Sequence, residues 1–175
     1  TVISCIDLDP NEKAIEADPF VEDGVCNDKV PTILASTSKT AKEAVDLLCG
    51  LYDSDGVDSA VMVLIADQDE AWVVENYTGH AYAAQKLPDD KMAVFANEPM
   101  IKTVDDDTIC SANLLTLPVD NVFAVYDDDK NLDIVLTYNC DNKYSDEAHV
   151  REWIGHDIFA PSQELSYDPD KDNDM

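Results

Sequence analysis

Several side chains in this sequence have the chemistry of metal ligands, and their spacing decides whether they could act as such. Possible oxygen ligands recur at every second position in two runs, a pattern typical of calcium-binding loops: Asp127, Asp129 and Asn131, and Asp168, Asp170, Asp172 and Asp174. Both runs lack the glycine that turns such a loop at its sixth position, where Leu132 and Asn173 stand, and neither has the closing glutamate. We therefore expect a calcium site at neither place, and a solvated acidic turn at 127–131.

Histidines and cysteines, the usual ligands of transition metals, lack the spacing of a metal site. His149 and His156 are separated by seven positions and His80 is remote, so we expect strand-end or helix-surface residues. The cysteines are odd in number and form no C-x-x-C pair. They are Cys5, Cys26, Cys49, Cys110 and Cys140. A bridge between two of them remains an alternative, but we expect reduced, buried thiols, no metal and no cofactor.

Composition restricts the possible partners. The 175 residues, 45% of them hydrophobic, suffice for one domain with a real core. The formal net charge is −27, and Arg151 is the single arginine. Phosphate binding needs clustered basic residues, so we expect neither nucleic acid nor membrane as a partner. No apolar run reaches the ~18 to 20 residues that span a bilayer and no signal peptide is seen, so we expect a reducing, cytoplasmic location.

Hydrophobic periodicity predicts helices followed by an antiparallel meander. Residues 1–9 alternate as a strand, and 11–17 form a short helix. Thr40 and Glu43 make a capping box for a further helix, with Gly50 at its end. Four strands joined by short polar turns follow, the first of them apolar on both faces. We expect them at 59–66, 71–77, 80–87 and 92–96.

The second half gives a weaker signal. Residues 121–140 predict a hairpin around the acidic turn, and Ser145 caps an expected helix over 145–154. The charged tail at 166–175 is expected to fray. We expect residues 1–175 to form a single domain that is part of a longer protein.

One stretch carries a more specific pattern. Residues 70–101 read "EAWVVENYTGHAYAAQKLPDDKMAVFANEPMI", with "NEKAIEADPFVEDG" and "KTAKEAVDLL" before them and "REWIGHDIFAPS" after them. The order and spacing of these blocks resemble the PepD-like dipeptidases, cysteine hydrolases of the N-terminal-nucleophile superfamily. Ala81, Tyr82 and Lys86 stand where the pattern more often has His, Trp and Arg, which leaves the substrate preference open.

The resemblance implies an α+β fold, an αββα sandwich of mostly antiparallel sheets, of which this chain forms an incomplete portion. It also implies hydrolysis of small peptides by an amino-terminal cysteine whose own α-amino group takes the thiol proton. Enzymes of this superfamily need an oxyanion donor, commonly an asparagine at a strand end, and Asn97 falls there. Asn97 could equally start the N-E-P turn, as asparagine does well. No role can be assigned to Glu75 or His80, for which packing or turn duties are expected.

The nucleophile is the main departure from the pattern. Residue 1 is threonine, and the segment that follows it resembles an interior block of the family. Thr1 could act as a nucleophile through its own amine, but we expect it to be an interior residue of a longer chain. Cys5 has no free α-amine. We therefore expect part of a dipeptidase, inactive alone; the alternative is a non-catalytic acidic domain that binds cations or cationic partners.

Overall fold

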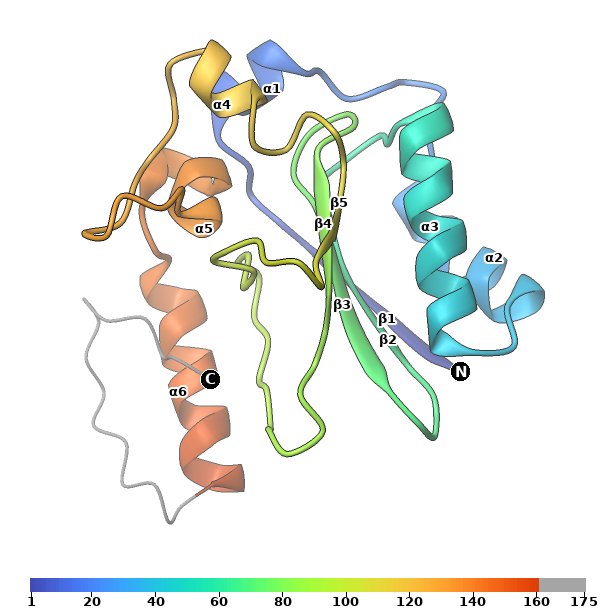
Figure 1. Cartoon of the computed structure of the whole chain (residues 1–175). Helices are drawn as coiled ribbons and strands as arrows, with labels where there is room; N and C mark the ends of the chain where they lie inside the picture. The colour runs from blue at the N-terminus through green and yellow to red at the C-terminus, as the bar shows by residue number, and fades with distance from the viewer. Residues whose placement is uncertain (161–175) are drawn as a thin grey trace.

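A five-stranded antiparallel sheet forms the centre of the computed structural model, which describes residues 1–160 (Figure 1). The order of the strands in the sheet is their order in the chain, so each strand pairs with its predecessor. The register runs from Val2 opposite Ala66 to Ala83 opposite Cys110. The strands are β1 (Val2–Asp7), β2 (Val61–Ala66), β3 (Ala71–Asn76), β4 (Tyr82–Lys86) and β5 (Ile109–Cys110).

Helices lie on both sides of this sheet (Figure 1). The Thr40 side chain caps α3 by accepting a hydrogen bond from Glu43 N at 3.1 Å, as predicted. The helix continues past Gly50 and ends at Gly56, whose φ of 68° suits glycine. The helices are α1 (Glu12–Ala17), α2 (Val30–Thr37), α3 (Ala41–Asp55), α4 (Leu117–Asp120), α5 (Ile134–Tyr138) and α6 (Asp146–Phe159), with short 3-10 turns η1 (Asn27–Lys29) and η2 (Cys140–Asn142).

Each face of the sheet has its own hydrophobic core, as strand alternation requires. On one face Val63 packs with Leu34 of α2 and Leu48 of α3. On the other face Met62 packs with Tyr138 of α5 and with residues of the irregular segments. The predicted apolar character of β2 on both faces thus matches its burial in both cores.

The α+β class and the antiparallel arrangement are confirmed. Within residues 1–160 there is one sheet, so its second face is not covered by a further sheet from this segment. Instead, α1, α5 and the irregular segments around Ile101 and Leu114 pack there.

Two predicted strand regions are wrong. Residues 92–96 have no regular structure, because Ile109 and Cys110 occupy the edge of β4 instead. The predicted hairpin at 121–140 retains only an isolated bridge between Tyr126 and Leu132. Its second arm is helix α5, in which the Asp133 side chain caps the first turn by accepting from Leu136 N at 2.9 Å.

Two further expectations remain untested. The tail at 166–175 and the acidic run at 168–174 lie outside the described residues. The extent of the single domain over 1–175 therefore stays a prediction. Helix α2 was not predicted, because its eight residues are too few to show a clear helical periodicity.

Candidate functional site

Asn97 is an exposed residue of a largely buried loop and does not lie at a strand end. Its Nδ2 donates a hydrogen bond to the Asp7 carbonyl at 2.8 Å. Its Oδ1 accepts one from Nη1 of Arg151 at 3.0 Å. The amide is thus oriented by the end of β1 on one side and by α6 on the other.

A polar groove surrounds this amide. It has a volume of about 880 Å³ and is lined by Asp9, Asn97, residues 139–141, 143–147 and Arg151. That volume is in the range of small-molecule sites. We call it the Asn97 groove. Its single guanidinium and its several carboxylates could bind the carboxylate and the ammonium of a small zwitterion.

Buried carboxylates replace the missing strand as the support of residues 96–101, which we call the Asn97 loop. Glu75 on β3 accepts hydrogen bonds from Met100 N at 2.7 Å and Ile101 N at 3.3 Å. Glu152 on α6 accepts one from Ala96 N at 3.3 Å. The sequence prediction placed Asn97 at the end of a strand, whereas in the structure hydrogen bonds from backbone N–H groups to buried carboxylates hold the loop.

Glu75 is fully buried in the core beneath this loop. Burial raises its pKa from 4.5 to about 7, although hydrogen bonds from Met100, Tyr77 and Ile101 act in the opposite direction. The Tyr77 hydroxyl donates to Glu75 Oε2 at 2.8 Å. Glu75 contacts the loop backbone and not the Asn97 groove, so its position is that of a support.

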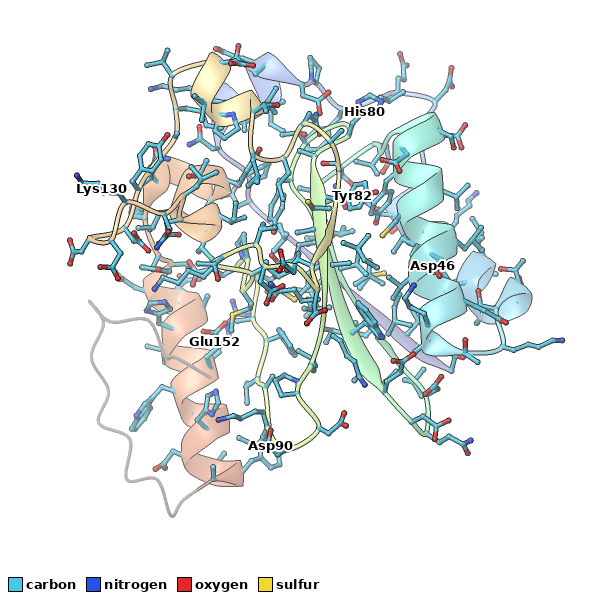
Figure 2. All side chains as sticks on the ribbon, viewed as in Figure 1. Asp46, His80, Tyr82, Asp90, Lys130 and Glu152 are labelled. Atoms are coloured by element: carbon cyan, nitrogen blue, oxygen red, sulfur yellow. The ribbon has the colours of Figure 1, made fainter. Side chains whose placement is uncertain are left out.

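His80 belongs to a separate polar cluster at the turn between β3 and β4. Asp18 accepts hydrogen bonds from Thr78 Oγ1 at 2.7 Å and from His80 N at 2.8 Å, and its Oδ1 lies 3.0 Å from His80 Nδ1. Burial acts to raise the pKa of Asp18, but the bonds from Thr78 and His80 outweigh it and lower the pKa. Figure 2 shows His80 near one end of the sheet and Glu152 on the side where α6 lies. The fold does not bring His80 close to Asn97.

A second cavity, of about 750 Å³, opens along β4. It is lined by Trp72, residues 85–89, Ala93, Met100 and Asp105, among others. It includes part of the "LPDD" block but not Asn97. We take the Asn97 groove as the candidate site because it holds the proposed donor.

Three of the cysteine thiols, those of Cys5, Cys49 and Cys140, are poorly suited to attack a carbonyl. Burial raises the pKa of Cys5 to about 11 and that of Cys49 to about 12. Burial, and then Asp9 and Asp141, raise the pKa of Cys140, which lines the Asn97 groove. A raised pKa leaves less of the nucleophilic thiolate.

Thr1 is also remote from Asn97. Its hydroxyl lies 3.4 Å from the Lys39 carbonyl. Asn97 contacts Asp7 at the other end of β1, so a six-residue strand of roughly 20 Å separates them. An attacking Thr1 and an oxyanion donor at Asn97 could not serve one carbonyl.

Sequence reasoning missed one cluster of possible ligands. Glu98, His149 and Glu152 come together in the interior, next to the Asn97 loop. The available signal was His-x-x-Glu at 149–152 within a predicted helix, because residues three apart share a helix face. At the acidic turn, Asp127 instead accepts hydrogen bonds from Asn131 N and Nδ2, as expected of a solvated turn.

An antiparallel sheet of an α+β fold thus borders a polar groove in which the Asn97 amide is held in one orientation. Comparison with known sequences identifies the family: residues 4–174 match the model of peptidase family C69. The chain belongs to peptidase family C69, which confirms the resemblance to PepD-like dipeptidases.

No helix within residues 1–160 is both long enough and apolar enough to cross a bilayer.

The chain is similar to several proteins described as dipeptidases. It is 28% identical to probable dipeptidase B of Streptococcus pyogenes serotype M6, over 90% of this chain and 32% of that protein. It is 33% identical to probable dipeptidase B of Lactococcus lactis subsp. lactis, over 61% of this chain and 23% of that protein. A probable dipeptidase of Salmonella dublin is 28% identical over 89% of this chain and 37% of its own length. The chain thus spans about a third of the length of the first of these relatives, 32%.

Proposed function

We propose that this chain is part of a cysteine-type dipeptidase, in which Asn97 donates a hydrogen bond to the oxyanion and the nucleophile lies outside these 175 residues. The membership in peptidase family C69 and the described relatives support the reaction. The observation that carries the site is the Asn97 amide, held by Asp7 and Arg151 within the groove. The raised pKa values of Cys5, Cys49 and Cys140 support an external nucleophile.

In the proposed reaction the α-amino group of an amino-terminal cysteine takes the thiol proton, and the thiolate attacks the peptide carbonyl. Negative charge then develops on the former carbonyl oxygen. An amide nitrogen carries two hydrogens, so Asn97 can keep its bond to Asp7 and direct the second hydrogen to that oxygen. A neutral donor stabilises this charge without burying another ion.

Arg151 contributes by fixing which way the Asn97 side-chain amide points. Its guanidinium donates to Asn97 Oδ1, so Nδ2 must point away from α6, toward the end of β1. A charged donor on the oxygen also polarises the amide and strengthens the N–H as a donor.

We propose a dipeptide as the substrate. Because all five cysteines are free, we also propose a reducing cytoplasmic location.

The substitution Asn97→Ala tests the site in the full-length protein. We expect kcat for unblocked dipeptides to fall by about 10²- to 10³-fold, as for loss of one oxyanion donor. Asn121→Ala is the matched control, because Asn121 is also exposed and also donates its amide to a backbone carbonyl, that of Leu117 at 2.8 Å. Thermal unfolding of both variants separates loss of chemistry from loss of folding.

Equal kcat in Asn97→Ala and in the native protein would remove Asn97 from the mechanism.

A further expectation concerns the 175-residue chain by itself, which should show no turnover of a dipeptide panel. Turnover by this chain that disappeared in Thr1→Ala would instead place the nucleophile at Thr1.

A further inference from the structure

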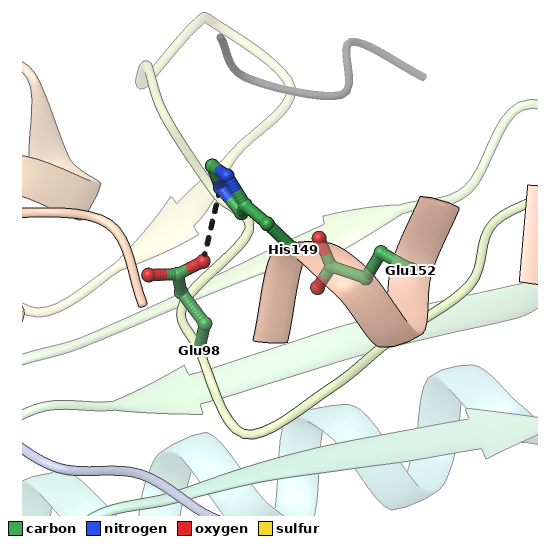
Figure 3. Close-up of side chains that lie close together, drawn as sticks. All are labelled: Glu98, His149 and Glu152. Atoms are coloured by element: carbon green, nitrogen blue, oxygen red, sulfur yellow. Dashed lines mark ion pairs between the residues drawn. The ribbon is translucent and has the colours of Figure 1, made fainter. Parts of the chain in front are cut away.

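Three buried side chains from two distant segments lie close together (Figure 3). His149 and Glu152 project from one face of α6, three residues apart, and Glu98 comes from the Asn97 loop. Their exposed fractions are 1% for Glu98, 1% for His149 and 2% for Glu152. Two carboxylates and an imidazole are thus enclosed in the protein interior.

The distances suit a shared ion. His149 Nε2 lies 3.3 Å from Glu98 Oε2. One ligand atom from each residue lies within 4.8 Å of the other two. A point therefore exists within roughly 2.8 Å of all three atoms, and bonds of about 2.0 to 2.2 Å to zinc need only small side-chain rotations.

Neighbouring donors orient both carboxylates. Glu98 Oε1 accepts hydrogen bonds from Asn139 Nδ2 at 2.8 Å and from Ser145 N at 2.5 Å, while Oε2 faces His149. Glu152 Oε1 accepts one from Ala96 N at 3.3 Å. Hydrogen bonds that fix one oxygen and direct the other inward are the usual support of metal-binding carboxylates.

We propose that Glu98, His149 and Glu152 bind a divalent transition-metal ion, with zinc as the best chemical fit. Imidazole favours such ions, whereas calcium and magnesium prefer sites made of oxygen alone. The net charge of −27 also raises the local concentration of cations. Bound metal joins the Asn97 loop to α6. This inference does not depend on the proposed dipeptidase activity.

Metal binding by the full-length protein tests the proposal. After chelator treatment and desalting, titration calorimetry with Zn²⁺ should show an equivalent that Glu98→Gln loses or binds about 10- to 100-fold more weakly. Glu152→Gln should have the same effect. Asp157→Asn is the matched control, because it removes one exposed carboxylate from the same helix. Calcium at the same concentration should not compete.

Two readouts on the unmodified protein keep the test independent of variant folding. Cobalt bound at this site should give weak visible bands without thiolate-to-cobalt charge transfer, since the ligands contain no sulfur. Zn²⁺ should slow amide hydrogen exchange at residues 96–98 and 149–152. Binding that is unchanged in both glutamine variants, a thiolate band, or no binding at all would each show that the cluster is only an ion pair.

Discussion

The buried carboxylate of Glu75 links pH to stability. Its pKa is raised from 4.5 to about 7 in the folded state by burial. Between those values the folded state holds a proton that the unfolded state has lost, so stability falls as pH rises through this window. The full difference corresponds to about 3 kcal/mol.

Glu75→Gln should remove this pH dependence. We expect the free energy of unfolding of the variant, relative to the native protein, to rise by about 3 kcal/mol between pH 4.5 and pH 7.5, because glutamine stays neutral. Urea denaturation across this range measures it. Glu16→Gln, which removes an exposed carboxylate on α1, is the control. Parallel stability curves for the Glu75 variant and the native protein would contradict the prediction.

For single residues, the sequence indicated that Asn97 could be functional, but it did not indicate which buried side chains contact one another. Asn97 could be selected because a family pattern surrounds it. Glu98 and His149 could not be paired, because the contact joins segments about 50 positions apart and depends on how α6 lies against the loop. A packing role was among the expectations for Glu75, but its hydrogen bonds to the backbone of Met100 and Ile101 could not be foreseen, because they join segments 25 and 26 positions apart.

The turn between β3 and β4 is held against the segment after α1, and glycine is required there for space. Gly79 N donates to the Asp18 carbonyl at 3.1 Å. A Cβ on Gly79 would lie 2.2 Å from the Pro19 carbonyl oxygen, a backbone atom that cannot rotate away. The turn and this segment can approach so closely only without a side chain at Gly79.

Gly79→Ala should therefore destabilise the protein, by about 1 to 3 kcal/mol, because the backbone must shift. Gly50→Ala is the matched control with the opposite sign. Gly50 lies inside α3 with nothing within 4 Å of an added Cβ, so alanine should stabilise by about 1 kcal/mol. Denaturant midpoints of both variants measure the effects. Equal shifts in one direction would refute the steric explanation.

Helices and strands with their own local signals were predicted, and those that tertiary contacts determine were not. The capping box at Thr40 and the cap at Ser145 each marked a helix correctly. Residues 92–96 have a strand's composition, yet the edge of β4 is taken by β5. Residues 134–138 are also β-prone, but the Asp133 cap and burial on the second face of the sheet favour helix α5.

The charge of the whole molecule should make its stability depend on salt. With a net charge of −27, repulsion among carboxylates opposes the compact state. The Debye length falls from about 30 Å at 0.01 M to about 10 Å at 0.1 M salt, which weakens that repulsion. We expect the melting temperature to rise by several degrees over this range. Sodium and choline chlorides at equal ionic strength should act alike, and a rise confined to sodium would indicate ion binding instead.

The dependence on salt also distinguishes the two functions considered for this chain, binding of cationic partners and hydrolysis of dipeptides. A domain that binds cationic partners should lose affinity for a probe such as tetralysine steeply as salt increases, because charge attraction is screened. A dipeptide zwitterion carries little net charge, so kcat/KM of the full-length protein for such a substrate should change far less over the same range. A steep fall of kcat/KM with salt would mean that the net charge steers the substrate, and the acid excess would then belong to the active site rather than to the surface as a whole.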